Sequence, residues 1–194
     1  MLITSDFEVA EPVDAVWRFF GDIPQVAACL PGAELDQELG EDAYGGTVAI
    51  RMGPVKLEFA GTAAIKERDE AGKRLVVDAA GADEKGRGQA AMLLTASLSP
   101  TAAGTSVEVV QDLQLSGAAA QYGRGMVADV TAVLMKDFAT NMQARITAIE
   151  EGRSPDEVAT AAPASGLGVA FAALRMALAR VFRRFFIPYR PEPT

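Results

Sequence analysis

The sequence predicts an α+β fold in which a curved antiparallel sheet wraps around one long helix. Three patterns support this: an apolar residue at every fourth position from Met126 to Ile146, a two-residue alternation through residues 33–115, and short glycine-containing turns inside that stretch. Short turns favour antiparallel strands, because parallel strands need long crossover connections. Steps of four overshoot the helical turn by roughly 40°, so the apolar stripe drifts around the helix. Such a stripe suits a helix that crosses a twisted sheet diagonally.

The first thirty residues predict one strand followed by two short helices. Residues 2–10 alternate apolar and polar side chains, which is typical of a half-buried strand. Pro12 stands at a favoured position for the start of a short helix, which Gly21 ends. Asp22 is a suitable cap for a second helix over residues 23–30.

Six more strands and the long helix complete the predicted domain, which spans residues 1–150. The strands are expected at residues 33–38, 44–52, 55–68, 73–82, 89–98 and 106–115. The helix is expected from Ala118 to about Glu151, with Gly152 as its stop. Strands with short turns followed by one helix indicate an antiparallel meander that grips the helix.

The composition excludes several classes of function. The chain has no histidine, which removes the commonest general base and the usual zinc ligand, so we expect no catalytic residues and no metal site. Its net charge of −8 argues against nucleic-acid binding. Cys29 is the one cysteine, and its apolar neighbours predict a buried, inert thiol. The start of the chain lacks the basic and apolar pattern of a signal peptide, so a cytoplasmic location is expected.

Residues 151–194 differ from the domain in composition. Residues 151–165 hold two prolines and many small side chains without a period, which predicts a flexible linker. In residues 166–194, five arginines against one glutamate give a charge of +4, and the total of −8 leaves −12 for residues 1–165. We refer to residues 166–194 as the basic tail.

The basic tail predicts an amphipathic helix that lies on an anionic membrane surface. Its apolar face would hold Leu167, Phe171, Leu174, Leu178, Val181, Phe182 and Phe185, and its basic face Arg175, Arg180, Arg183 and Arg184. The tail lacks the roughly 20 consecutive apolar residues that a spanning helix needs. The alternative is a helix that docks on its own domain or on a partner protein.

Strand parity places one set of side chains on the sheet face that looks toward the long helix. Several small residues and adaptable methionines on this face predict a cavity for an apolar ligand, whereas interdigitated small and large residues would give a solid core. Gln111 is an inward polar residue whose amide needs a partner, and Tyr122 would stand near the start of the helix. The candidate lining residues are Met52, Phe59, Met92, Leu94, Gln111, Leu113, Tyr122, Met126, Val130 and Leu134.

Three short segments resemble the CoxG family, the G-subunit family of carbon monoxide dehydrogenase. They are Cys-Leu-Pro-Gly-Ala at residues 29–33, Gly53–Pro54 before an alternating strand that contains Gly61, and Ser-Gly-Ala-Ala-Ala-Gln-Tyr-Gly-Arg at residues 116–124. The resemblance covers about residues 1–150. That family is part of the polyketide-cyclase and START-like superfamily, whose helix-grip fold is the layout predicted above.

The resemblance implies an accessory protein of an aerobic molybdenum hydroxylase such as CO dehydrogenase, associated with the inner face of the cytoplasmic membrane. The superfamily implies an apolar cavity. Because a gas-oxidising hydroxylase must pass electrons to the respiratory chain, the expected ligand is a quinone, either menaquinone or ubiquinone. Two alternatives are a structural tether without ligand and a small cyclase-like enzyme. The missing histidine counts against the enzyme.

Overall fold

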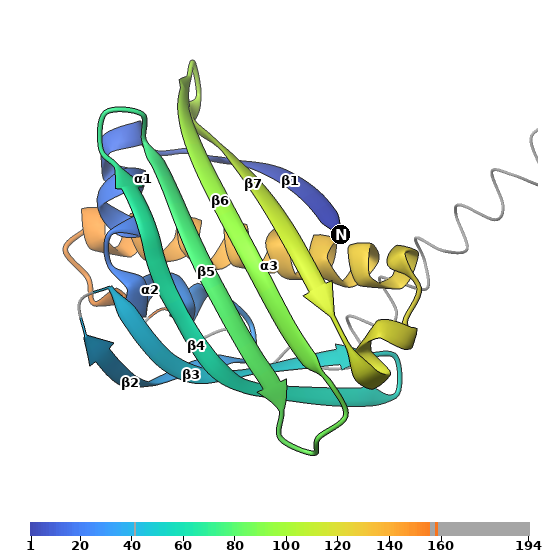
Figure 1. The fold of residues 1–194 in the computed structure, drawn as a ribbon. Helices are drawn as coiled ribbons and strands as arrows, with labels where there is room; N and C mark the ends of the chain where they lie inside the picture. Colours follow the sequence, from blue (N-terminus) through green and yellow to red (C-terminus); the bar gives the residue numbers. More distant parts are fainter. Residues whose placement is uncertain (41, 156–157, 159–194) are drawn as a thin grey trace, which may run out of the picture.

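The computed structural model describes residues 1–40, 42–155 and 158, and it contains one antiparallel sheet that curves around a long helix (Figure 1). The strands are ordered β1-β7-β6-β5-β4-β3-β2, so each pairs with its neighbour in sequence except that β1 joins β7. This confirms the predicted meander. The elements are β1 (Leu2–Val9), α1 (Val13–Phe20), α2 (Ile23–Cys29), β2 (Ala33–Gly40), β3 (Ala43–Met52), β4 (Val55–Asp69), β5 (Arg74–Asp83), β6 (Gln89–Thr101), β7 (Gly104–Leu115), the 3₁₀ helix η1 (Gly117–Gln121) and α3 (Arg124–Glu150).

Local signals set the two short helices as predicted. Pro12 precedes α1, where its missing N–H costs nothing because a first-turn N–H has no partner within the helix. The Asp22 carboxylate accepts a hydrogen bond from the backbone N–H of Gln25 at 3.1 Å and thereby caps α2. Both helices lie against the C-terminal half of α3 (Figure 1).

The long helix begins later than the sequence predicts. Residues 117–121 form η1, and the extended backbone of Tyr122 and Gly123, with ψ values of 114° and 153°, separates it from α3. A tertiary contact accounts for the difference, because the N–H of Ala118 donates to the carbonyl of Arg87 at 2.6 Å. Tyr122 therefore lies in a junction before the helix. The other end agrees with prediction, since Gly152 has a φ of +71° and follows the last turn.

The side chains between sheet and helices form two apolar clusters. The first cluster lies under α1, α2 and the C-terminal half of α3, and its buried residues are Val9, Val16, Trp17, Phe19, Phe20, Cys29, Leu75, Ala96, Leu98, Val107, Val109, Phe138, Met142 and Ile146. The second cluster lies under η1 and the N-terminal half of α3, and its buried residues are Met52, Leu57, Phe59, Ala119, Val127 and Val130. The core is thus divided along the length of α3.

Glycines allow the sheet to curl beside the second cluster. Gly61 on β4 pairs with Gly46 on β3 and with Gly81 on β5, so three glycines lie in one row across the strands. A Cβ atom on Gly61 would lie 2.0 Å from the carbonyl oxygen of Ala80, which no side chain tolerates. The sequence suggests that Gly61 and Gly81 leave room on the inner face. The structure shows that Gly61 lacks a side chain because the neighbouring strand occupies that space.

The described part of the chain contains no helix with the length and apolar character needed to cross a bilayer. Most of the predicted linker and the whole basic tail, including the membrane-associating residues from Leu167 to Phe185, lie outside the described residues.

Candidate ligand-binding site

Six of the ten predicted lining residues come together in the second cluster. Met52, Phe59 and Val130 are buried in it, with 6%, 7% and 4% of their surfaces exposed. The other three pack against it and are partly buried: Leu113, Tyr122 and Leu134. These side chains come from β3, β4, β7, the junction before α3 and α3 itself, so the cluster joins the inner face of the sheet to the helix.

The other four predicted residues lie outside the second cluster. Leu94 packs against the first cluster. Met92 is half-buried and pairs with Leu113 on β7, which places it beside the second cluster. The prediction that Met126 lines the site is wrong, because 44% of its surface is exposed. The late start of α3 explains this, since Met126 falls in the first turn, where the helix end meets solvent.

Gln111 is the polar group at the boundary between the two clusters. It is 5% exposed, and it follows Val109 of the first cluster and precedes Leu113 of the second at the same side of β7. Its register partners are Ile3 on β1 and Leu94 on β6. No described residue makes a hydrogen bond to its side-chain amide. Its amide atoms are not among the fully buried polar atoms without a partner, so they keep some contact with solvent and can both donate to and accept from a bound molecule.

An ion pair with a buried aspartate lies near the second cluster, at the turn between β5 and β6, and the sequence analysis did not identify it. Arg87 donates from Nε and Nη2 to the two carboxylate oxygens of Asp83 at 2.8 and 2.7 Å, and the Glu58 backbone N–H donates at 3.1 Å. The hydrogen bonds from the Arg87 guanidinium hold the pKa of Asp83 well below its usual value, although burial opposes this. The signal in the sequence was an acid and an arginine four residues apart around Gly86, which has a φ of +69°.

Arg87 also links three segments that are distant in sequence. Its Nη2 donates to the carbonyl of Lys56 at 2.7 Å, and its own carbonyl accepts from Ala118 at 2.6 Å. The β3–β4 turn, the β5–β6 turn and η1 therefore gather at one end of the molecule (Figure 1). We refer to residues 51–58, 83–88 and 117–126 as the loop end. It closes the second cluster from outside.

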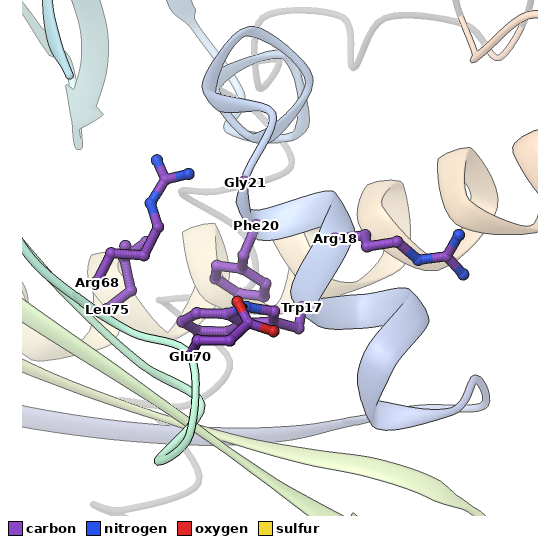
Figure 2. A pocket seen from close by; sticks show the side chains of 7 residues that line it. All are labelled: Trp17, Arg18, Phe20, Gly21, Arg68, Glu70 and Leu75. Carbon is purple, nitrogen blue, oxygen red and sulfur yellow. The ribbon is translucent and has the colours of Figure 1, made fainter. Parts of the chain in front are cut away.

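A pocket of about 200 Å³ lies elsewhere, between α1 and the β4–β5 turn (Figure 2). Its lining residues are Trp17, Arg18, Phe20, Gly21, Arg68, Glu70 and Leu75, none of which the sequence singles out as a ligand residue. The Trp17 indole N–H donates to Glu70, and this bond together with Lys73 lowers the pKa of the Glu70 carboxyl. In Figure 2 the side chains of Arg18 and Arg68 extend away from the aromatic rings. The pocket is smaller than the roughly 300 Å³ typical of ligand sites.

Cys29 confirms the prediction of a buried thiol. It is 0% exposed, and burial raises its pKa to about 12 even though Arg145 acts in the opposite direction. A thiol with this pKa is almost entirely protonated at neutral pH and is a poor nucleophile. Its Sγ donates to the carbonyl of Gln25 at 3.3 Å, so the residue serves the packing of α2.

Solved structures of the same architecture support the fold. A conserved protein from Geobacillus kaustophilus matches with a TM-score of 0.68 and 21% identity, covering 76% of this chain and 95% of its own. The Zhui aromatase/cyclase from Streptomyces sp. R1128 matches with a TM-score of 0.57 and 14% identity, covering 76% and 94%. A START superfamily protein from Mycobacterium smegmatis matches with a TM-score of 0.53 and 14% identity, covering 76% and 98%. At these identities the likeness shows the helix-grip fold alone.

Sequence comparison identifies the family. None of the curated protein sequences matches the chain significantly. The profile of the carbon monoxide dehydrogenase G subunit (CoxG) matches residues 6–147, which include β1 from Asp6 onward, every other strand and nearly all of α3. This range contains the three segments whose resemblance was noted in the sequence. The chain therefore belongs to the CoxG family of carbon monoxide dehydrogenase.

Proposed function

We propose that this protein is a non-enzymatic accessory protein of an aerobic molybdenum CO dehydrogenase, and that it carries a respiratory quinone between its sheet and α3. Membership of the CoxG family supports the association with the dehydrogenase. The START-like fold supports the binding of an apolar molecule. A quinone is the ligand that would connect a gas-oxidising hydroxylase with the respiratory chain, because quinones are the lipid-soluble electron carriers of that chain.

The largely buried side chain of Gln111 is the observation that carries this proposal. It is 5% exposed, lies between two apolar clusters and has no hydrogen-bond partner among the described residues. The amide atoms keep some contact with solvent, so a ligand carbonyl that accepts its N–H would replace water and gain about 1 kcal/mol, the net worth of one hydrogen bond. The half-buried side chains of Leu113 and Leu134 would then contact the ligand ring.

The basic tail supports a location at the inner face of the cell membrane. Four arginines close to an anionic surface contribute about 4 kcal/mol of binding free energy, before the insertion of the apolar face is counted. In this proposal the tail keeps the domain near the bilayer that supplies the quinone. Deleting residues 166–194 should lower the fraction of the protein that sediments with anionic vesicles. Equal sedimentation of the two forms would remove this part of the proposal.

Replacing Gln111 with Leu tests the ligand contact directly. Leu keeps the apolar bulk and removes the amide, so the affinity for a short-chain menaquinone analogue should fall about five- to tenfold, the worth of one hydrogen bond. The stability of the ligand-free protein should change little, because the amide makes no hydrogen bond to a described residue. The matched control is Gln114→Leu on the same strand, where the side chain is exposed and affinity should not change. Fluorescence titration and thermal unfolding give the two readouts.

A second pair of variants separates a carrier from a structural tether. Val130→Trp adds bulk inside the second cluster and should abolish quinone binding, whereas Met126→Trp adds the same ring at an exposed position and should preserve it. Native mass spectrometry of protein purified with its membranes should show bound quinone in the parent and in Met126→Trp only. If the parent binds no quinone and Val130→Trp loses about 1–3 kcal/mol of stability through overpacking, the tether is the correct function.

A further inference from the structure

We propose that the loop end docks on an anionic lipid surface, so that the second cluster faces the bilayer. This inference rests on the proposed function only where it concerns the transfer of a ligand, because docking of the domain itself requires no quinone. It concerns the folded domain and is separate from any contribution of the basic tail. Three observations carry it: the charge of the loop end, the state of its acidic groups and its exposed apolar tips.

The loop end has the opposite charge to the domain that bears it. Residues 51–58, 83–88 and 117–126 contain five cations and three acids, which gives +2, while residues 1–165 carry −12 in total. Arg51 and Lys56 are also direct partners across the β3–β4 hairpin. Like charges at directly opposite positions destabilise a strand pair. An anionic surface against the hairpin would offset this repulsion.

Two of the three acids of the loop end are already paired with its cations. Asp83 is buried and forms an ion pair with Arg87, and Glu58 forms one with Lys56, so Glu84 is the third acid of the loop end. Among the described residues, three exposed cations at this end have no carboxylate within ion-pair distance: Arg51, Lys85 and Arg124. Their charge is therefore available to lipid phosphates, and each cation near such a surface raises the binding constant about fivefold.

Apolar tips stand among these cations. Gly53 and Pro54 are exposed at the β3–β4 turn, and 44% of Met126 is exposed in the first turn of α3. An apolar tip surrounded by basic side chains is the pattern of surfaces that insert shallowly into the interface of an anionic bilayer. An acidic protein surface would bind the cations but would offer Met126 no apolar contact. The combination favours lipid.

The docked orientation would give an apolar ligand a short route. Three residues of the loop end also belong to the second cluster: Ala119 is buried in it, and Val55 and Tyr122 pack against it. A hydrocarbon tail that moves between bilayer and cluster at this end would avoid exposure to water, which is unfavourable. The contacts of Arg87 with Lys56 and Ala118 hold the three segments together around this route.

A site-specific fluorophore on the full-length chain tests the orientation. Cys29 is buried, so a single introduced cysteine takes the label. An environment-sensitive NBD probe at Met126→Cys should show a blue shift and a severalfold gain in emission with vesicles containing phosphatidylglycerol, and little change with pure phosphatidylcholine. The same probe at Ala102→Cys, in the exposed β6–β7 turn, should respond to neither. An equal response at both positions, or a response at residue 102 alone, would overturn the proposal.

Charge variants provide the second test. Arg51→Gln combined with Arg124→Gln should lower the partition coefficient on anionic vesicles about thirtyfold, at about fivefold per cation near the surface. The matched control, Arg18→Gln with Lys136→Gln, removes the same charge from exposed residues outside the loop end and should bind as the parent does. Equal losses in both double variants would mean that net charge alone matters and would refute docking by this end.

The outcomes distinguish this inference from the proposed function. Quinone titration of the same variants without vesicles reports the ligand site alone. Normal quinone binding with a probe at residue 126 that ignores every vesicle would refute the membrane orientation and leave the carrier function. In that case, a probe response to the purified dehydrogenase would assign the loop end to a protein partner instead.

Discussion

The two ends of the molecule bury apolar side chains of the same kinds but enclose them to different degrees. The first cluster has fourteen buried residues and eight partly buried ones around them, whereas the second has six and ten. Val16, Cys29, Ala96, Val107 and Met142 of the first cluster are 0% exposed, and no member of the second reaches that value. The second cluster is therefore the part of the core with more side-chain surface left to cover.

The difference follows from what covers each end. Two helices, α1 and α2, close the first cluster. Polar contacts fasten α2 to α3, because Arg145 donates to the Gln25 side chain at 2.6 Å and Asn141 donates to the carbonyl of Cys29 at 2.9 Å. Among the described residues, η1 and two turns join the N-terminal half of α3 in covering the second cluster, and no second helix like α1 or α2 lies over it. Segments with little buried apolar surface open at lower free-energy cost than a helix-covered core. The first cluster should therefore contribute most of the free energy of unfolding. Ligand exchange should occur at the end of the molecule that holds the second cluster.

The largest expected effect compares two phenylalanines of nearly equal burial. Phe138 of the first cluster and Phe59 of the second are 8% and 7% exposed, and the Phe138 ring also packs edge-on against Phe7 with 6.0 Å between centroids. Phe138→Ala should cost about 3–5 kcal/mol of unfolding free energy, and Phe59→Ala about 1–3 kcal/mol, because the looser end can collapse around the lost ring. Urea denaturation measures both. Equal losses would show that the two clusters are equally packed.

The next effect concerns the curl of the sheet beside the second cluster. Gly61→Ala should cost about 1–3 kcal/mol, because the new Cβ would lie 2.0 Å from the carbonyl of Ala80 and the strands must separate. Gly45→Ala is the matched control, since its Cβ would meet no atom closer than the Cβ of Gln37 at 3.3 Å, which needs a shift of only a few tenths of an ångström. Thermal unfolding of the pair gives the comparison. A control as unstable as Gly61→Ala would trace the loss to glycine content instead of to the curl.

A smaller effect, dependent on pH, should come from the pair that braces the loop end. The Asp83 pKa is lowered in the folded protein by Arg87, so its contribution to stability is present above the unfolded value of about 3.9 and is lost as pH falls through the folded value. Asp83→Asn should therefore be less stable than the parent at pH 7, and the gap should narrow below about pH 4. Arg87→Gln should show the same narrowing. A gap that stays constant down to pH 3 would contradict the role of the charge.

The smallest effect involves no change in stability. Cys29, with a pKa of about 12 and 0% exposure, should resist iodoacetamide at pH 8 in the folded protein and react once urea unfolds it. An added cysteine at exposed Ala120 in η1 should react at the rate of a free thiol. Mass spectrometry follows both sites in the Ala120→Cys chain. Fast alkylation of Cys29 in the folded protein would mean that the structure around the first cluster opens as readily as the structure around the second.

Local patterns in the sequence were sufficient for the element types, their order and the antiparallel meander. Alternation and helical periodicity depend on residues within one element, and turns depend on glycine or proline at the turn itself. Asp22 is an example, because a cap needs only the next three residues. The burial of Cys29 was also predictable, since its neighbours on α2 are apolar. The inward placement of Met52, Phe59 and Leu113 followed from strand parity.

Contacts between distant segments decided the rest. The late start of α3 depends on a hydrogen bond between Ala118 and Arg87, and that start places Met126 at the surface. Gly61 lacks a side chain because of a backbone atom on another strand. The burial of the Gln111 side chain depends on every residue packed around it. Such features follow from how curved elements meet in space, and a one-dimensional pattern carries no record of those distances.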